Sequence, residues 1–181
     1  MKLLSSLHAA VLAVLLIGSL SPSRAAVTDF TFLNGLSGAN EIPVNASSGS
    51  YTINTLRFDD SVGTFGSFSV VVDFAGLQGG ANNAHIHGLA PVGVNGGTLQ
   101  GLSYTAASSG TISGAWLPVS SAQVTGLFAG QTYINIHSTS VGGGEWRGQL
   151  IPLPANVPEP STWALVGAGA LGLLYRRRRR A

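Results

Sequence analysis

The stretch Tyr133-Ile134-Asn135-Ile136-His137 alternates apolar and polar side chains. Successive side chains of a β-strand point to opposite faces of the sheet, so Ile134 and Ile136 share one face while Asn135 and His137 share the other. This alternation predicts a half-buried strand whose isoleucines face a core. His137 is then expected on the outer face.

Two further segments carry the same pattern. In Ala84-His85-Ile86-His87, both histidines lie on the face opposite Ile86. In residues 145–150, Glu-Trp-Arg-Gly-Gln-Leu, the pattern predicts Trp146 and Leu150 inside and Glu145 and Arg147 outside. If the three strands are neighbours, four side chains are expected to converge: His85, His87, His137 and Glu145.

The rest of the central chain consists of similar short runs punctuated by glycine. We expect strands at seven places: 27–33, 51–58, 65–74, 84–87, 111–117, 133–137 and 145–150. Short strands separated by turn signals are typical of an all-β antiparallel sandwich of the immunoglobulin-like or superoxide-dismutase-like kind. One short helix is expected over 122–129, capped by Ser120 and Ser121 and stopped by Gly130.

Charge separates the chain into an acidic body and basic ends. Of nine Lys and Arg residues, five form the run 176–180 and two, Lys2 and Arg24, lie near the start. The body keeps only Arg57 and Arg147 against all seven acidic residues, which leaves a net charge of −5 with neutral histidines. Such a body cannot neutralise a phosphate backbone, so we expect no nucleic-acid binding.

Cysteine is absent from the whole chain. Its absence excludes disulfides, thiol catalysis and thiolate metal ligands together. Nucleophilic serine catalysis also lacks a recognisable setting, because no Gly-x-Ser-x-Gly elbow is present.

Residues 1–25 have the features of a secretory signal peptide. Lys2 supplies the basic start, residues 3–20 are mostly apolar, and Ser23-Arg24-Ala25 places small residues at the −3 and −1 positions. We therefore expect signal peptidase to cut between Ala25 and Ala26. The alternative is a membrane anchor that is retained.

The C-terminal segment has three parts in a fixed order. A proline-rich stalk over 152–162 includes Val157-Pro158-Glu159-Pro160, an apolar run follows over 163–175, and five arginines close the segment. As a helix the run spans about 20 Å, which is less than the ~30 Å of a bilayer core but feasible for a thin span. The arginines are expected to stay cytoplasmic, which places the body across the inner membrane.

This order resembles the PEP-CTERM sorting signal of Gram-negative bacteria that make exopolysaccharide. The resemblance implies a transmembrane sorting helix and arginine tail over 163–181, and a membrane protease of the exosortase type that cuts near the Pro-Glu-Pro. The alternative is a plain anchor helix on a proline-rich stalk. The resemblance favours sorting to the cell surface, because an ordinary anchor needs neither the motif nor so short a span.

Several body segments, taken in order, resemble the chordin-type CHRD domain. They are Leu36-Ser37-Gly38-Ala39-Asn40-Glu41-Ile42-Pro43, Ala84-His85-Ile86-His87-Gly88, Ala129-Gly130, Tyr133-Ile134-Asn135-Ile136-His137 and Gly144-Glu145-Trp146-Arg147-Gly148-Gln149-Leu150. The resemblance covers a domain over 26–151 and implies an extracellular module. It departs from the family at Ile42-Pro43-Val44, where two prolines are frequent, and at Trp146, where an aliphatic residue is usual.

The histidines leave two interpretations open. Three imidazoles and the Glu145 carboxylate suit Zn²⁺ or Cu²⁺, so His85, His87, His137 and Glu145 form a candidate metal site. Alternatively, His85 and His87 hydrogen-bond loop backbone and fix the turn over 88–97. The His-x-His pattern also resembles the copper-side motif of copper-zinc superoxide dismutase, although the rest of that enzyme's pattern is missing.

Three classes of function follow from the sequence. The favoured class is a non-catalytic module at the cell surface or in the extracellular matrix, associated with exopolysaccharide or surface proteins in a biofilm. The second is a divalent metal-binding module, and the third is a metalloenzyme of the dismutase type. The first class requires only the two export signals and a stable sandwich.

Overall fold

The structure is a computed structural model that describes residues 27–118 and 120–154. The predicted signal peptide, its cleavage site at Ala25 and Ala26, the sorting motif and the arginine tail lie outside the described residues. Neither helix within the described ranges has the length and hydropathy that a membrane crossing requires.

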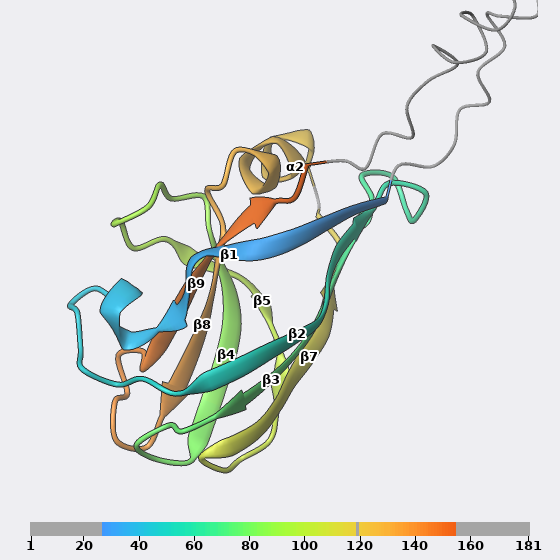
Figure 1. Ribbon diagram of the computed structural model, residues 1–181. Helices are drawn as coiled ribbons and strands as arrows, with labels where there is room; N and C mark the ends of the chain where they lie inside the picture. Colours follow the sequence, from blue (N-terminus) through green and yellow to red (C-terminus); the bar gives the residue numbers. More distant parts are fainter. Residues whose placement is uncertain (1–26, 119, 155–181) are drawn as a thin grey trace, which may run out of the picture.

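The described chain is an antiparallel all-β sandwich with one short α-helix, as predicted (Figure 1). The strands are β1 Val27–Ser37, β2 Ser50–Asp59, β3 Ser67–Ala75, β4 Ala81–Gly88, β5 Gly97–Gly101, β6 Ser103–Tyr104, β7 Ser109–Trp116, β8 Tyr133–Ser138 and β9 Trp146–Pro152. A 3₁₀ turn, η1, covers Gly38–Asn40, and the helix α2 covers Ser121–Phe128.

Two layers face each other across the core. One contains β2, β3, β7 and β6, and the other contains β9, β8, β4 and β5. Strand β1 belongs to both, because Val27–Asp29 pair with β2 and the following part of the strand pairs with β9. On the other side β5 pairs with β4 and β6 with β7, so the sandwich is nearly closed along both edges.

The sequence missed β5 and β6. Both lie in a stretch rich in glycine and polar residues, where no alternating apolar pattern indicates a strand. Leu102 separates the two strands, and its amide donates to the carbonyl of Ala84 at 2.9 Å. Pro152, which the sequence assigned to the stalk, is instead the last residue of β9 and pairs with Phe30.

The core follows the alternation predicted from the sequence. Every apolar side chain expected inside from β4, β8 and β9 is fully buried: Ile86, Ile134, Ile136, Trp146 and Leu150. The opposite layer contributes alternate residues of β3 to the same core: Phe68, Val70, Val72 and Phe74. The indole Nε1 of Trp146 donates to the Ser47 hydroxyl at 2.9 Å, so its one polar atom is also satisfied.

Helix α2 begins and ends as the sequence predicts. The Ser120 side chain caps it by accepting from the amide of Gln123. Gly130 follows the helix with φ +68°, a left-handed conformation that favours glycine. The helix lies at the end of the sandwich where β1 begins (Figure 1).

Truncation of the buried indole tests this core. Trp146→Ala should lower the free energy of unfolding by about 3–5 kcal/mol, the usual cost of deleting a large buried aromatic side chain. The control Leu117→Ala removes a side chain that is 57% exposed and should cost less than about 0.5 kcal/mol. Urea denaturation of both variants gives the comparison, and a cost below ~1 kcal/mol for Trp146→Ala would contradict the face assignment.

Candidate metal centre

The three histidines converge on the outer face of the β4–β8 pair. In the register of these strands His85 lies opposite Asn135, His87 opposite Tyr133, and Asn83 opposite His137. Each imidazole is half-buried, and one ring nitrogen from each can be chosen so that all three lie within 4.8 Å of one another. The predicted convergence of these three side chains is therefore present in the fold.

Hydrogen bonds orient two of the rings. His87 Nδ1 lies 3.0 Å from the carbonyl oxygen of Gly96, and His137 Nδ1 lies 3.0 Å from that of Gly142. A carbonyl can only accept, so each Nδ1 carries the proton and donates it. The Nε2 atoms of His87 and His137 consequently carry the lone pair, and that of His137 lies 3.4 Å from His85 Nδ1. Metal-ligating histidines are held in the same way by a backbone carbonyl on the other ring nitrogen.

The free Nε2 atom of His87 is an unsatisfied buried group. It is shielded from solvent and has no hydrogen-bond partner in the structure. Nearby, His137 Nε2 lies 3.4 Å from His85 Nδ1. A buried polar atom without a partner costs free energy, and a cation between the three rings would satisfy it.

Burial favours the neutral form of the His85 and His87 imidazoles. Burial lowers the pKa of His85 below its ordinary value, and the neighbouring rings of His137 and His87 lower it further. Burial also lowers the pKa of His87, with smaller contributions of the same sign from His137 and Arg147, opposed by the hydrogen bond to Gly96. Since metal ligands must be deprotonated, these shifts favour the form that binds a cation.

A stack of planar groups supports His87. Its ring lies parallel to that of Tyr133, with centroids 5.0 Å apart and planes 7° apart. The Arg147 guanidinium carbon lies 3.5 Å from the centroid of the Tyr133 ring. The Tyr133 hydroxyl accepts from the amide of Gly96, whose carbonyl holds His87. The 88–97 segment and the sheet thus fix this imidazole together.

The structure corrects the prediction for Arg147. The side chain lies on the outer side of the sheet, but it is only 2% exposed because the 88–97 segment covers it. Its guanidinium donates to the carbonyl of Val94, to the Asn95 side chain and to Gln149. Strand alternation gave the direction of this side chain correctly and its exposure wrongly.

Glu145 is not placed with the histidines, and the prediction that it faces outward is wrong. It precedes β9 and is fully buried, accepting hydrogen bonds from the Ser47 hydroxyl and from the amide of Gln78. The Ser47 hydroxyl also accepts a hydrogen bond from the indole N–H of Trp146, so Glu145 belongs to a polar cluster beside the core. Alternation does not extend to this residue because the strand begins only at Trp146.

Sequence reasoning missed a second buried carboxylate on the same layer. Glu41 follows η1, is 4% exposed and accepts from the side-chain amide of Asn135, which lies opposite His85 in the sheet. Burial raises the pKa of Glu41 to about 7, against the lowering effects of the Ile42 amide, Arg147 and Asn135. The sequence signal that could have indicated this contact was the position of Asn135, which shares a strand face with His137.

Gly144 packs directly against the side chains of Glu41 and Asn135. Its φ is +128°, and a Cβ at this position would lie 2.6 Å from Asn135 Nδ2 and 2.8 Å from a carboxylate oxygen of Glu41. Only glycine fits there. The connection between β8 and β9 therefore packs on Asn135 through Gly144 and holds His137 through Gly142.

The arrangement can hold one borderline-soft divalent cation. Zn²⁺ and Cu²⁺ accept neutral imidazole nitrogens, and a tetrahedral site with bonds of ~2.0–2.1 Å places its ligand atoms about 3.3 Å apart. The ring nitrogens lie within 4.8 Å of one another, so binding of a cation requires the imidazoles to move closer together. Three protein ligands leave further coordination positions open on the solvent side.

Comparison with known proteins gives two matches. A family model described as CHRD domain matches residues 32–150, and one described as PEP-CTERM protein-sorting motif matches residues 156–180. The second match supports export as a membrane-anchored precursor and sorting to the cell surface by an exosortase-type protease. Neither the curated proteins nor the solved structures compared with the chain give a significant match.

The buried carboxyl of Glu41 makes stability depend on pH. Its pKa in the folded protein, about 7, lies above the ordinary value of 4.5, so the folded state retains a proton that the unfolded state loses. Stability should therefore fall as pH rises from about 4.5 to about 7, by at most about 3 kcal/mol. Glu41→Gln, which is neutral at every pH, should remove this loss and be more stable than the wild type at pH 8.

Urea denaturation of both proteins at pH 5 and pH 8 measures the effect. The comparison is between variant and wild type, because the lowered pKa values of His85 and His87 give the opposite trend in both proteins. Parallel pH profiles for Glu41→Gln and the wild type would show that folding does not raise the pKa of Glu41.

Proposed function

The chain belongs to the CHRD domain family over residues 32–150, and we propose that this body is a non-catalytic cell-surface module. We further propose that it holds one divalent cation. The ligands are His85, His87 and His137, and the cation is Zn²⁺ or Cu²⁺. The observation that carries this proposal is the buried, unpartnered Nε2 of His87 beside the two other imidazoles.

The site fits presentation of a metal better than a purely structural role for the histidines. Backbone carbonyls fix two rings so that both Nε2 lone pairs are available. A structural histidine that only braced the 88–97 segment would need the Nδ1 bond of His87 and no convergence of three rings. In addition, the core of the described residues does not need a cation, because apolar side chains fill the sandwich.

Association with exopolysaccharide is the second part of the proposal. The sorting motif supports delivery of the body to the cell surface, where a matrix of polysaccharide and surface proteins is the available partner. Open positions on a bound cation would accept oxygen ligands such as carboxylates of that matrix. A dismutase activity of the metal-loaded protein is the competing function, and a superoxide assay separates it from the non-catalytic role.

Removal of single ligands tests the metal site. His85→Ala, His87→Ala and His137→Ala should each weaken Zn²⁺ binding by more than about 10–100-fold, since even supporting residues around a metal contribute that much. Asn83→Ala changes the same face of β4 without removing a ligand and should bind as the wild type does. Isothermal titration with Zn²⁺ measures the affinities, which should fall as pH drops through the lowered pKa values of His85 and His87.

Among these variants, His85→Ala best separates metal binding from protein stability. Its ring has no backbone partner in the structure, whereas His87 and His137 also hold carbonyls. His85→Ala should therefore lose the metal with little change in the free energy of unfolding. Unchanged Zn²⁺ affinity in His85→Ala would refute the site, and unfolding of His87→Ala without altered metal content would assign the histidines a structural role.

Processing is tested separately. Mass spectrometry of the cell-surface or secreted form should find a chain that starts near Ala26 and ends near Pro158-Glu159-Pro160, because both export signals are removed. A mature protein outside the inner membrane that retains Arg176 to Arg180 would contradict sorting by an exosortase-type protease. The metal proposal does not depend on this result.

A further inference from the structure

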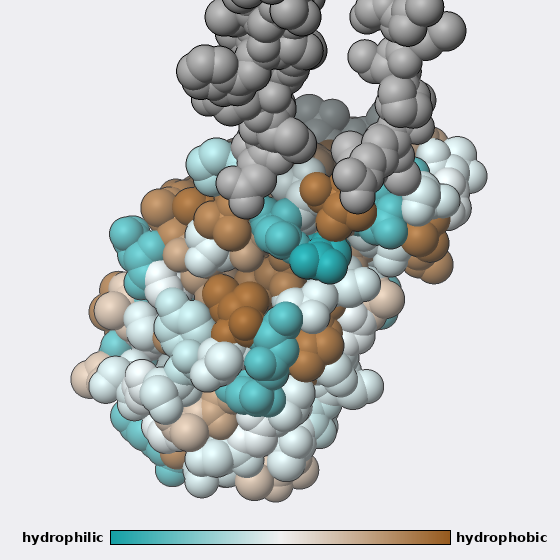
Figure 2. All heavy atoms as spheres, turned by 45° about the vertical axis from the view of Figure 1, so that its right-hand side comes forward, coloured by the Kyte–Doolittle hydropathy of each residue, from teal (hydrophilic) through white to brown (hydrophobic). Residues whose placement is uncertain are grey.

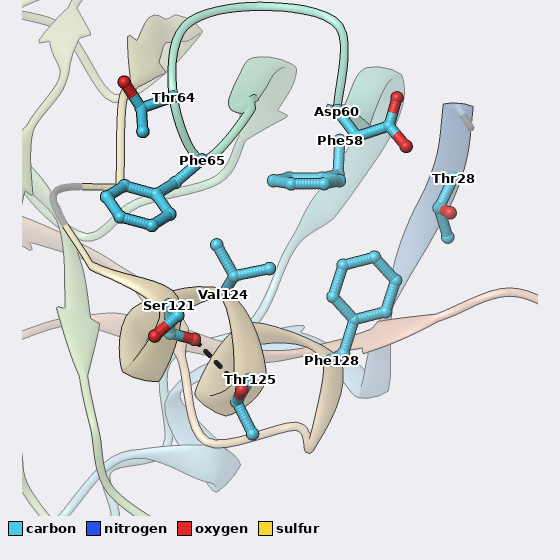
Figure 3. A pocket seen from close by; sticks show the side chains of 9 residues that line it. All are labelled: Thr28, Phe58, Asp60, Thr64, Phe65, Ser121, Val124, Thr125 and Phe128. Atoms are coloured by element: carbon cyan, nitrogen blue, oxygen red, sulfur yellow. Dashed lines mark hydrogen bonds between the residues drawn. The ribbon is translucent and has the colours of Figure 1, made fainter. Parts of the chain in front are cut away.

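One end of the sandwich carries an apolar groove of about 530 Å³ between α2 and the β2–β3 connection (Figure 3). Phe58 forms its floor and is 4% exposed, while Phe65 and Phe128 flank it and are each 38% exposed. The edge of Phe128 packs on Phe58 and Phe30, with centroids 5.2 and 5.4 Å apart. The Phe128 ring is therefore anchored on the core yet partly open to the outside.

The groove is lined by aromatic side chains, by hydroxyl-bearing side chains and by one carboxylate, that of Asp60. The Thr125 hydroxyl is engaged within the helix, because it donates to the carbonyl of Ser121 at 2.9 Å. Asp60 stands at one side of the groove, beside Thr28 of β1. A groove with apolar walls and an acidic rim does not suit an anionic or strongly polar ligand.

Both described ends of the chain lie at this end of the molecule. Thr28, the second residue of β1, lines the groove, and the amide of Leu153 donates to the carbonyl of Asp29 at 2.8 Å. Val27 and Leu153 add two further exposed apolar side chains, at 51% and 44%. In Figure 2 hydrophobic residues form several patches on the visible face, with hydrophilic residues between them.

The length of the remaining chain limits how far this end can lie from a membrane. Only residues 155–162 separate Pro154 from the apolar run that begins at Trp163. At ~3.3–3.6 Å per residue these nine steps reach at most about 32 Å. In the anchored precursor the groove is thus confined near the bilayer surface, where a tether raises the local concentration of even a weak contact.

We propose that this groove is a lipid-docking surface of the anchored precursor, in which Phe65 and Phe128 enter the interface of a zwitterionic bilayer. The inference rests on the membrane-anchored precursor of the proposed function and is independent of the metal site. Aromatic side chains favour the region between lipid headgroups and acyl chains. Docking there holds the domain end, and with it the following Pro-Glu-Pro segment, at the membrane surface until the chain is cut.

The experiment uses the full chain reconstituted in phosphatidylcholine vesicles. Because the protein has no cysteine, Thr64→Cys beside the groove and Ser140→Cys in the β8–β9 connection each provide a single labelling site for an environment-sensitive fluorophore. Spin-labelled phosphatidylcholine should quench the label at position 64 and leave the label at position 140 largely unquenched. Adding Phe65→Ser should abolish most of the quenching at position 64, whereas Val44→Ser, at a side chain 70% exposed elsewhere, should preserve it.

Results that differ from these expectations show whether the membrane anchor, the docking surface or the choice of lipid as its ligand is wrong. A chain that alkaline carbonate extracts from the vesicles overturns both the anchor and the docking surface. A chain that stays integrated but shows equal quenching at positions 64 and 140 overturns the docking surface alone. In a third outcome, the lipid quencher does not quench the label at position 64, but the emission of that label shifts in Trp163→Ala. The groove then holds the chain's own C-terminal segment, and the assignment to lipid is wrong.

Discussion

The alternation of side chains along β8 is the constraint on which the rest of the molecule depends. Ile134 and Ile136 fill the core between the layers, so the intervening Asn135 and the following His137 must point to the opposite face. Pairing with β4 sets the histidines of that strand on the same face, and pairing with β9 adds Arg147. A shift of register by one residue would bury the imidazoles and expose the isoleucines.

The outer face of this sheet is polar but not open to water. Segments 38–47 and 88–97 cover it, so Asn135 and Arg147 are buried on the side away from the core. The cost of removing these groups from water is met by hydrogen bonds from the covering segments, such as those of Arg147 with Val94 and Asn95. The three histidines are half-buried at the margin of this covered region, which is where three ligand nitrogens come together.

Sequence alternation predicted the direction of these side chains but not what lies over them. Periodicity of two placed Ile86, Ile134 and Trp146 inside and brought the three histidines together, because the pattern of a strand is local. Burial of Arg147 depends on a loop 50 or more residues away in the chain, and that of Glu145 on contacts with Ser47 and Gln78. Strands β5 and β6 were not predicted for a related reason. They are defined by hydrogen-bonded pairing with β4 and β7 at the edges of the layers and not by alternation in their own sequences.

The central claim is that three imidazole nitrogens of one outer face bind a single cation. X-ray absorption spectroscopy of the Zn²⁺-loaded protein at neutral pH observes that coordination directly. The account predicts three nitrogen neighbours at ~2.0–2.1 Å with the outer-shell scattering of imidazole rings. A first shell of oxygen atoms alone, without imidazole scattering, would contradict it.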